Sequence, residues 1–266
     1  MGPALWQRSA RVERFQPGDA VYFCSGGLRK FGTGNYAPYA VVDERVVAPK
    51  PRSLSFAAAA LLVLITAWEA LDNRGRLEAG RRVPNHAGAG WVSHVAVQLA
   101  KLAGADVATT VGSAEKADFV RELGADLPIQ SKDTDFVRAA MEWTGGEGVE
   151  LAFDTVGGAT FAPTFAAVQP GGLVTLLKPA AETDWTLARS RNLCIGLELL
   201  LTPQLTDNLD AQVAQANILA QCARLFDRGE LTLRVGQTFP LERAADTDRA
   251  IETGSTTGKI DLLMPE

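Results

Sequence analysis

A glycine-rich turn is the segment of this sequence whose residue types and spacing best suit chemistry. Gly88, Gly90 and Ser93 form a Gly-x-Gly-x-x-Ser variant of the turn that opens a dinucleotide-binding helix. Gly88 permits a tight turn, and Gly90 lets backbone N–H groups approach a pyrophosphate at the positive helix end. Ser93 replaces the third glycine and can still cap the helix. The large indole of Trp91 either packs outward or occupies pyrophosphate space.

Two further pairs of polar residues lie near this turn. Ser113 and Lys116 follow the next predicted strand, where an Asp or Glu would hold the ribose of NAD. A hydroxyl and an ammonium suit a 2′-phosphate better, which favours NADP; alternatively, Ser113 caps a helix and Lys116 is solvated. His86 and His94 suggest a metal or acid–base role, but no further ligand lies at metal spacing, so structural roles are favoured.

These residues need a scaffold of alternating strands and helices, and the sequence predicts one. Strands are expected at residues 82–86, 106–111, 149–154 and 173–177, with helices at 92–103, 114–123, 135–144 and 160–168. Glycines at 104 and 124 close two of these helices. This alternation is typical of right-handed βαβ units and a parallel sheet. Up to about residue 51 the sequence indicates antiparallel β-strands, and residues 210–228 indicate a long helix.

Composition excludes several classes of protein. The chain has 266 residues, 47% hydrophobic content and a net charge of −5, with no basic run to bind nucleic acid. Three scattered cysteines suit a reducing cytoplasm, no signal peptide is visible, and the longest apolar run is too short to span a membrane. Hydrolase motifs are absent. We therefore expect a cytoplasmic protein that binds neither nucleic acid nor membrane.

Ordered segments along the chain carry a family resemblance. They include FQPGDAVY at residues 15–22, TAWEAL at 66–71, LGAD at 123–126, TGGEGV at 144–149, FDTVGG at 153–158 and TTGKI at 256–260. In this order and spacing, the chain resembles the medium-chain dehydrogenase/reductase superfamily, in its zinc-independent, zeta-crystallin-like quinone oxidoreductase branch. The resemblance implies an α/β fold: a Rossmann-type doubly wound parallel sheet with a partial GroES-like β domain.

The resemblance also implies a cofactor site. NADPH is the expected cofactor, no zinc is expected, and Asp154 is favoured as a turn former rather than a contact. No catalytic residue is identified. The cofactor-binding residues, from the turn and from the family's cofactor-lining segments together, are expected to be Thr66, Gly88, Gly90, Trp91, Val92, Ser113, Lys116, Val156, Gly157 and Lys259.

Departures from the family bear on the domains. The family's first β segment is absent, so residues 1–52 are expected to form a partial GroES-like domain that lacks its N-terminal strands. Residues 53–204 are expected to form the nucleotide-binding domain. Residues 205–266 are expected to complete it and return to the β domain. Pro84 and Asn85 fall within the central strand, which we expect to be weakened or bulged there.

Three hypotheses for function follow. The first is an NADPH-dependent, zinc-independent reductase that transfers hydride to a quinone or an α,β-unsaturated carbonyl (an enone). The second is a non-redox or ligand-binding descendant with an impaired nucleotide site. The third is a truncated, inactive homologue. The resemblance further implies a homodimer, for which the apolar stretch at residues 195–201 is the candidate edge; the same stretch could be an internal strand or helix.

Overall fold

The computed structural model describes residues 3–5, 13–24, 39–55, 61–178, 182–252, 257 and 259–263. The chain divides into two compact units, each described here by itself. Residues 66–199 form the first, called the sheet unit, and residues 1–65 with 200–266 form the second, called the flanking unit. None of the helices in the described ranges is long and apolar enough to span a bilayer.

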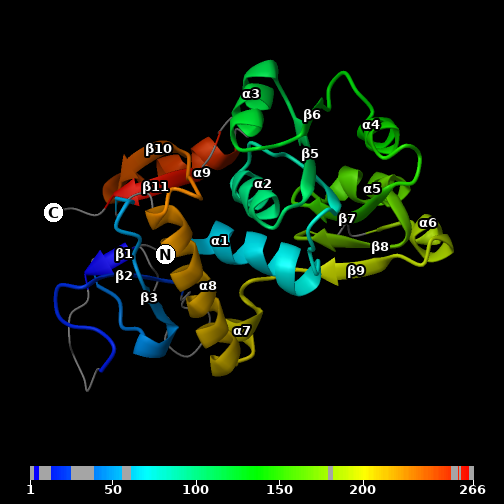
Figure 1. The fold of residues 1–266 in the computed structure, drawn as a ribbon. Helices are drawn as coiled ribbons and strands as arrows, with labels where there is room; N and C mark the ends of the chain where they lie inside the picture. Colours follow the sequence, from blue (N-terminus) through cyan, green and yellow to red (C-terminus); the bar gives the residue numbers. More distant parts are fainter. Residues whose placement is uncertain are drawn as a thin grey trace. The chain divides into compact units, whose positions relative to one another are not determined.

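The sheet unit is built on six parallel strands in the order β6-β5-β4-β7-β8-β9 (Figure 1). The strands are β4 (Arg82–Asn85), β5 (Asp106–Val111), β6 (Leu127–Gln130), β7 (Val149–Asp154), β8 (Val168–Leu176) and β9 (Cys194–Leu197). The chain moves outward from β4 to β6 and then restarts at β7 on the other side of β4. This is the strand order of a Rossmann sheet, which confirms the predicted fold class.

Helices follow the strands on both sides of this sheet (Figure 1). They are α2 (Ser93–Leu102), α3 (Ala114–Glu122), α4 (Phe136–Trp143), α5 (Phe161–Ala167) and α6 (Thr186–Ser190). Right-handed crossovers place α2 and α3 on one face, and the reversal at β7 places the next helices on the other. The strand order reverses between β4 and β7, and open α/β sheets bind ligands beyond the carboxyl ends of strands at such a point.

Burial of apolar side chains explains why these segments form strands and helices. In β7, Leu151, Ala152 and Phe153 are all fully buried, as expected for a strand covered on both faces. Phe161 and Phe165 of α5 pack against β7 and β8 in one core cluster, with their rings 4.8 Å apart and nearly perpendicular. This cluster fixes α5 against one face of β7 and β8.

The central strand β4 accommodates its proline by losing hydrogen-bonded pairing on one side only. Pro84 pairs with Ala108 of β5 in unbroken register, so the expected bulge is not present on that side. Toward β7, the one pairing in the described residues joins Asn85 to Phe153. The N–H of His86 donates to the carbonyl of Phe153, and Pro84, two residues earlier, faces the same way without an N–H. The expected weakening is therefore confined to the β7 side.

The apolar stretch at residues 195–201 begins in β9, at the edge of the six-stranded sheet. Leu197 and Leu199 are more than half exposed, whereas Glu198 between them is buried. The stretch is thus an edge strand that leads into a turn, in which Leu197 and Leu199 point outward while Glu198 and Leu200 point inward.

The flanking unit contains small sheets and a long helix. The antiparallel strands β1 (Pro3–Leu5), β2 (Ala20–Phe23) and β3 (Val47–Pro49) form one sheet, after η1 (Glu44–Val46) has led into β3. The buried Tyr22 hydroxyl donates to the Leu219 carbonyl of α8 (Leu209–Asp227). The remaining elements are α7 (Thr202–Leu205), β10 (Val235–Pro240), η4 (Leu241–Arg243), α9 (Ala244–Glu252) and β11 (Lys259–Leu263). The helix α1 (Leu61–Trp68) crosses the boundary between the units in the sequence, and the π-helix η2 (Glu69–Arg74) follows it within the sheet unit.

Candidate functional site

The glycine turn after β4 has no room for side chains at its two glycines. A Cβ at Gly88 would lie 2.2 Å from Thr109 Oγ1, and one at Gly90 would lie 2.9 Å from the Ala87 carbonyl oxygen. The turn is tied to its neighbour, since the Gly88 N–H donates to the Thr110 carbonyl at 2.9 Å and Ala87 N–H to Thr110 Oγ1 at 2.9 Å. The glycines therefore bring the backbone against β5, as the sequence predicted for a tight turn.

The amino end of α2 leaves backbone donors unused. Val92 is the N-cap residue of this ten-residue helix, and its side chain makes no capping bond. Within the described part of the chain, the N–H groups of Trp91, Val92 and Ser93 donate to no protein acceptor. Consecutive free amides at the positive end of a helix are the donor set that binds a phosphate group. This cradle fits a pyrophosphate.

The expectation that Ser93 caps α2 is wrong. Its hydroxyl turns back to the strand and donates to the His86 carbonyl oxygen at 2.7 Å. The hydroxyl of Thr155, after β7, donates to the same oxygen at 2.8 Å, and the two hydroxyl oxygens are 2.9 Å apart. The side-chain amide of Asn85 reaches the Ser93 carbonyl at 3.2 Å. Ser93 thus fastens the start of α2 to the ends of β4 and β7, which sequence reasoning did not foresee.

Asp154 shapes the turn after β7, as the sequence favoured. Its fully buried carboxylate accepts hydrogen bonds from the N–H groups of Val156 and Gly157, each at 2.8 Å, and from the Thr160 hydroxyl. Gly157 has φ +70, and a Cβ there would lie 2.0 Å from the carbonyl oxygen of Lys178. The turn therefore presses against the segment after β8 and requires glycine.

The residues expected after β5 occupy the predicted places. Ser113 is the N-cap of α3 and accepts from the Lys116 N–H at 3.3 Å, so the capping interpretation holds for its hydroxyl. Lys116 is half-buried, and its ammonium makes no ion pair with an acidic side chain in the described ranges. A lysine left without a carboxylate partner beside the carboxyl end of β5 is available to an anion.

The other expected residues lie in different places. Thr66 is buried in α1, Trp91 and Val92 are half-buried, and Val156 is 45% exposed. The structure therefore places the expected residues Gly88, Gly90, Trp91, Val92, Ser113, Lys116, Val156 and Gly157 at the carboxyl ends of β4, β5 and β7. Lys259 belongs to β11 of the flanking unit, and its side chain lies outside the described residues.

Both histidines have structural surroundings. His86 Nε2 lies 2.9 Å from Thr164 Oγ1, and that hydroxyl donates onward to the Thr160 carbonyl, so Nε2 carries the proton. His94 Nδ1 lies 2.9 Å from the Gly90 carbonyl oxygen and must be its donor. Burial lowers the pKa of both rings; the charge of Asp154 opposes this for His86, and backbone hydrogen bonds oppose it for His94.

Zinc does not fit the donors of the described chain. No group of three or more His, Cys, Asp or Glu side chains in those ranges could hold a metal ion. Both histidine rings make hydrogen bonds within the fold, and Cys24, Cys194 and Cys222 are not joined by disulfides and lie in separate parts of the chain. A structural or catalytic zinc site needs three or four such ligands converging on one point.

Sequence reasoning missed a buried carboxyl pair. Glu69 opens η2, Glu198 directly follows β9, and the Glu69 carboxyl is near enough to raise the pKa of the buried Glu198. The signal was available, because Glu198 is the one charged residue in the apolar stretch at 195–201.

Comparisons with known proteins agree on the kind of fold. Residues 123–261, more than half of the chain, match a family model described as zinc-binding dehydrogenase. A Pseudomonas aeruginosa quinone oxidoreductase is 29% identical over 96% of this chain and 77% of its own length. The crystal structure of Escherichia coli quinone oxidoreductase complexed with NADPH superposes with a TM-score of 0.82 at 25% identity, covering 95% of this chain and 77% of that one.

A much longer relative matches as well. One of the phenolphthiocerol/phthiocerol polyketide synthase proteins of Mycobacterium tuberculosis is 31% identical over 94% of this chain. The chain spans 12% of the length of that relative.

Proposed function

This chain belongs to the zinc-binding dehydrogenase family, within the medium-chain dehydrogenase/reductase superfamily, and from that premise we propose that it is an NADPH-dependent, zinc-independent reductase of quinones or α,β-unsaturated carbonyl compounds. The observation that carries the proposal is the set of free N–H groups at Trp91, Val92 and Ser93, beyond a turn whose glycines leave no room for side chains. An anion-binding helix start at the switch point of a Rossmann sheet is where a dinucleotide pyrophosphate binds.

The residues after each strand have separate tasks in this proposal. The amides of residues 91–93 hold the pyrophosphate, and Lys116 with Ser113 holds the 2′-phosphate of the adenosine. Thr66, Val156 and Gly157 line the nicotinamide side, where Asp154 fixes the turn. Lys259 is proposed as a further contact to the cofactor phosphate or ribose. The proposed domains are residues 1–52, 53–204 and 205–266.

When bound, NADPH would supply a hydride. The chain's own contribution is to bind, to orient and to keep the strand ends fixed. The hydroxyls of Ser93 and Thr155 both donate to the His86 carbonyl oxygen. The turn after β4, which binds the anion, and the turn after β7, which lines the nicotinamide side, are therefore held together. The exposed side chains of Leu197 and Leu199 at the β9 edge support the further proposal of a homodimer through that edge.

The direct test is a titration of the protein with NADPH, followed by nicotinamide fluorescence and by quenching of tryptophan emission. We expect saturable binding, and Trp91→Phe should remove part of the quenching because the indole lies in the turn. Lys116→Ala should weaken NADPH binding about tenfold, or ~1.4 kcal/mol, and leave NADH binding unchanged. Absence of binding at millimolar NADPH contradicts the proposal, and an equal loss for NADH contradicts the role of Lys116.

A further inference from the structure

Two acidic side chains from distant segments meet inside the sheet unit. The Glu198 side chain is fully buried, although its neighbours Leu197 and Leu199 are more than half exposed. This inverts the usual arrangement of an edge segment, in which the charged residue points to water. Glu69, from the π-helix η2 that packs against β9, is near enough to raise the pKa of Glu198. Two neighbouring carboxyl groups in a buried place are favoured when one of them carries a proton.

One cation lies beside this carboxyl pair. Arg74 Nε is 3.4 Å from Glu198 Oε2, but it donates its hydrogen bond to the Leu197 carbonyl at 3.3 Å. In the described residues, no N–H group donates to either oxygen of Glu198. The strands β8 and β9, which pack against η2, have no charged residue in their sequences. Glu69 and Arg74 are therefore the charged groups that face Glu198 from these elements.

These surroundings favour the protonated pair near neutral pH. Burial, followed by the neighbouring Glu69 carboxyl, raises the pKa of Glu198 to about 8, although Arg74 acts in the opposite direction. The proton belongs to the pair as a whole, as for other carboxyl groups that share a site.

The carboxyl pair lies on the reactive side of the sheet. The Leu177 N–H donates to the Asp154 carbonyl at the end of β7, and the Glu198 N–H donates to the Leu176 carbonyl at the end of β8. Glu198 thus stands in the same row of strand ends as the Asp154 turn. Thr66 and Glu69 are three residues apart at the junction of α1 and η2, which places them on one helix face. Short π-helical segments are often found at functional sites.

We propose that Glu69 and Glu198 together hold one proton and that this carboxyl pair donates it to the substrate anion left by hydride transfer. The inference rests on the proposed function. The hydride carries two electrons to the β-carbon of an enone, or to a quinone. The O–H bond of the pair then breaks, and a C–H bond forms at the α-carbon or an O–H bond forms at the quinone oxygen. The pair, left with two negative charges beside Arg74, recovers a proton from water.

The first experiment examines the proton without any cofactor. Infrared difference spectra of the whole protein, wild type minus Glu198→Gln, should contain the band of a protonated carboxyl group at neutral pH. The band should disappear as the pH rises through about 8. Glu69→Gln should remove or shift the same band, which provides a second variant if Glu198→Gln does not fold. Glu150→Gln, at the amino end of β7, is the matched control and should leave the band unchanged. Absence of a protonated-carboxyl band overturns the proposal.

The second experiment examines the chemistry. With an enone and saturating NADPH, Glu198→Gln should lower kcat about a hundredfold, remove the loss of rate at high pH and leave the Kd for NADPH unchanged. Wild-type kcat and an unchanged pH profile in this variant overturn the proton-donor role. A wild-type chain that binds no NADPH refutes the proposed function instead, and the infrared comparison still decides whether the pair holds its proton.

Discussion

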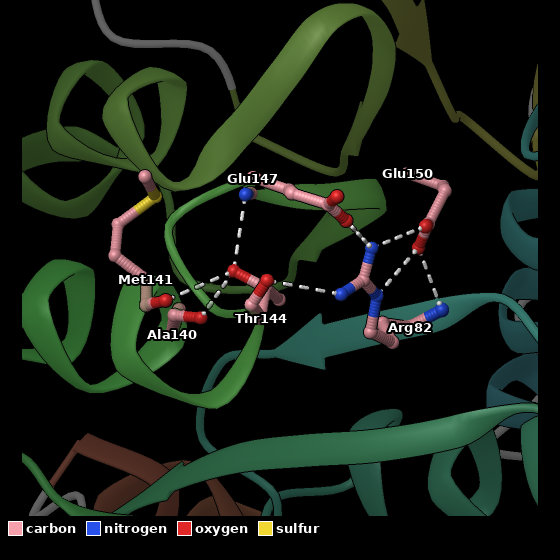
Figure 2. A network of polar contacts seen from close by, with 7 residues as sticks. Arg82, Ala140, Met141, Thr144, Glu147 and Glu150 are labelled. Carbon is pink, nitrogen blue, oxygen red and sulfur yellow. Dashed lines mark hydrogen bonds and ion pairs between the residues drawn. The ribbon is translucent and has the colours of Figure 1, made fainter.

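The two ends of the parallel sheet use their polar groups in opposite ways. At the amino end, Arg82 is enclosed by acceptors: its backbone N–H and guanidinium both reach Glu150 at 2.8 Å, and Glu147 and the Thr144 carbonyl lie at 3.3 Å (Figure 2). At the carboxyl end, the Ser93 and Thr155 hydroxyls both bind the His86 carbonyl, but the N–H groups of residues 91–93 donate to no acceptor among the residues that the structure describes. One end is closed upon itself, and the other presents donors.

The difference teaches which polar groups serve stability and which serve binding. Thr144 accepts from the Gly148 N–H and donates to carbonyls of α4, so this end of the sheet has its hydrogen-bonding groups matched (Figure 2). Burial alone would raise the pKa of Glu150, but the hydrogen bonds from Arg82 lower it overall. Free donors at a helix start are costly unless water or a ligand satisfies them, which is why they indicate binding.

The largest effect that separates the two ends is expected from Gly88→Ala. The new Cβ collides with three side-chain atoms of Thr109, so the turn must move and the amides lose their alignment. We expect the Kd for NADPH to rise about a hundredfold, or ~2.7 kcal/mol. Calorimetry measures this, with circular dichroism to establish that the variant is folded.

Two companion variants make that result specific. Thr109→Gly removes all three colliding atoms, so the double variant should recover part of the affinity. Arg82→Met, at the amino end, should lower the free energy of unfolding by about 1–3 kcal/mol because Glu150 loses its partner, while the Kd for NADPH stays within about twofold. A comparable loss of affinity in Arg82→Met would break the distinction between the ends.

A middle-sized effect is expected from the two hydroxyls that share the His86 carbonyl. Ser93→Ala and Thr155→Val should each lower the free energy of unfolding by about 1–2 kcal/mol. Because the two hydroxyls share an acceptor, each single variant leaves the His86 carbonyl one hydroxyl donor, and only the double variant removes both, so the double variant should lose more than the sum. Urea unfolding measures all three.

Thr144→Val supplies the matched control for this pair. It removes a buried hydroxyl at the amino end that shares no partner with Ser93, so its cost should add to that of Ser93→Ala. Strict additivity of Ser93→Ala and Thr155→Val would mean that the two hydroxyls act separately and that the carboxyl end is not one unit.

Much of this scaffold was predictable because local signals were strong. The predicted strands at residues 106–111 and 149–154 coincide with β5 and β7, which contain runs of buried apolar or β-branched side chains at residues 107–111 and 151–153. Glycines with positive φ end α2 and α3 at the predicted positions. The start of β8 was missed because Pro170 and two glycines suggested a turn, whereas the strand begins at Val168.

The candidate site was only partly predictable, because partners across the fold decide what a polar side chain does. Serine at a helix start normally caps the helix, and Ser93 turns away only because the His86 carbonyl is close enough to accept its hydroxyl. Glu198 appears in the sequence as one acid among leucines, and its partner Glu69 comes from a helix far earlier in the chain. No local pattern contains such a pairing.

The smallest effect is expected from a change of pH. The groups at the two ends of the sheet should lose their contributions to the free energy of unfolding in different pH ranges. Because the folded protein lowers the pKa of His86 below its ordinary 6.5, the stability it contributes is present above pH 6.5 and is lost as the pH falls below that value. Glu150, also lowered, keeps its contribution down to its ordinary 4.5 and loses it only in stronger acid. Of these two groups, His86 at the carboxyl end should therefore lose its contribution first, by at most about 1.4 kcal/mol per pH unit for one proton.

Urea unfolding between these two values tests this order. His86→Gln should flatten the slope of the free energy of unfolding just below pH 6.5. The remaining slope should belong to His94, whose pKa is lowered by burial as well, and to Glu198, whose raised pKa gives a slope of the opposite sign between 4.5 and about 8. Glu150→Gln should change the curve only below 4.5. An unaltered slope in His86→Gln would mean that this ring carries the same charge in the folded and unfolded states. The pH dependence of stability at the carboxyl end would then not come from His86, the residue whose backbone carbonyl binds both Ser93 and Thr155.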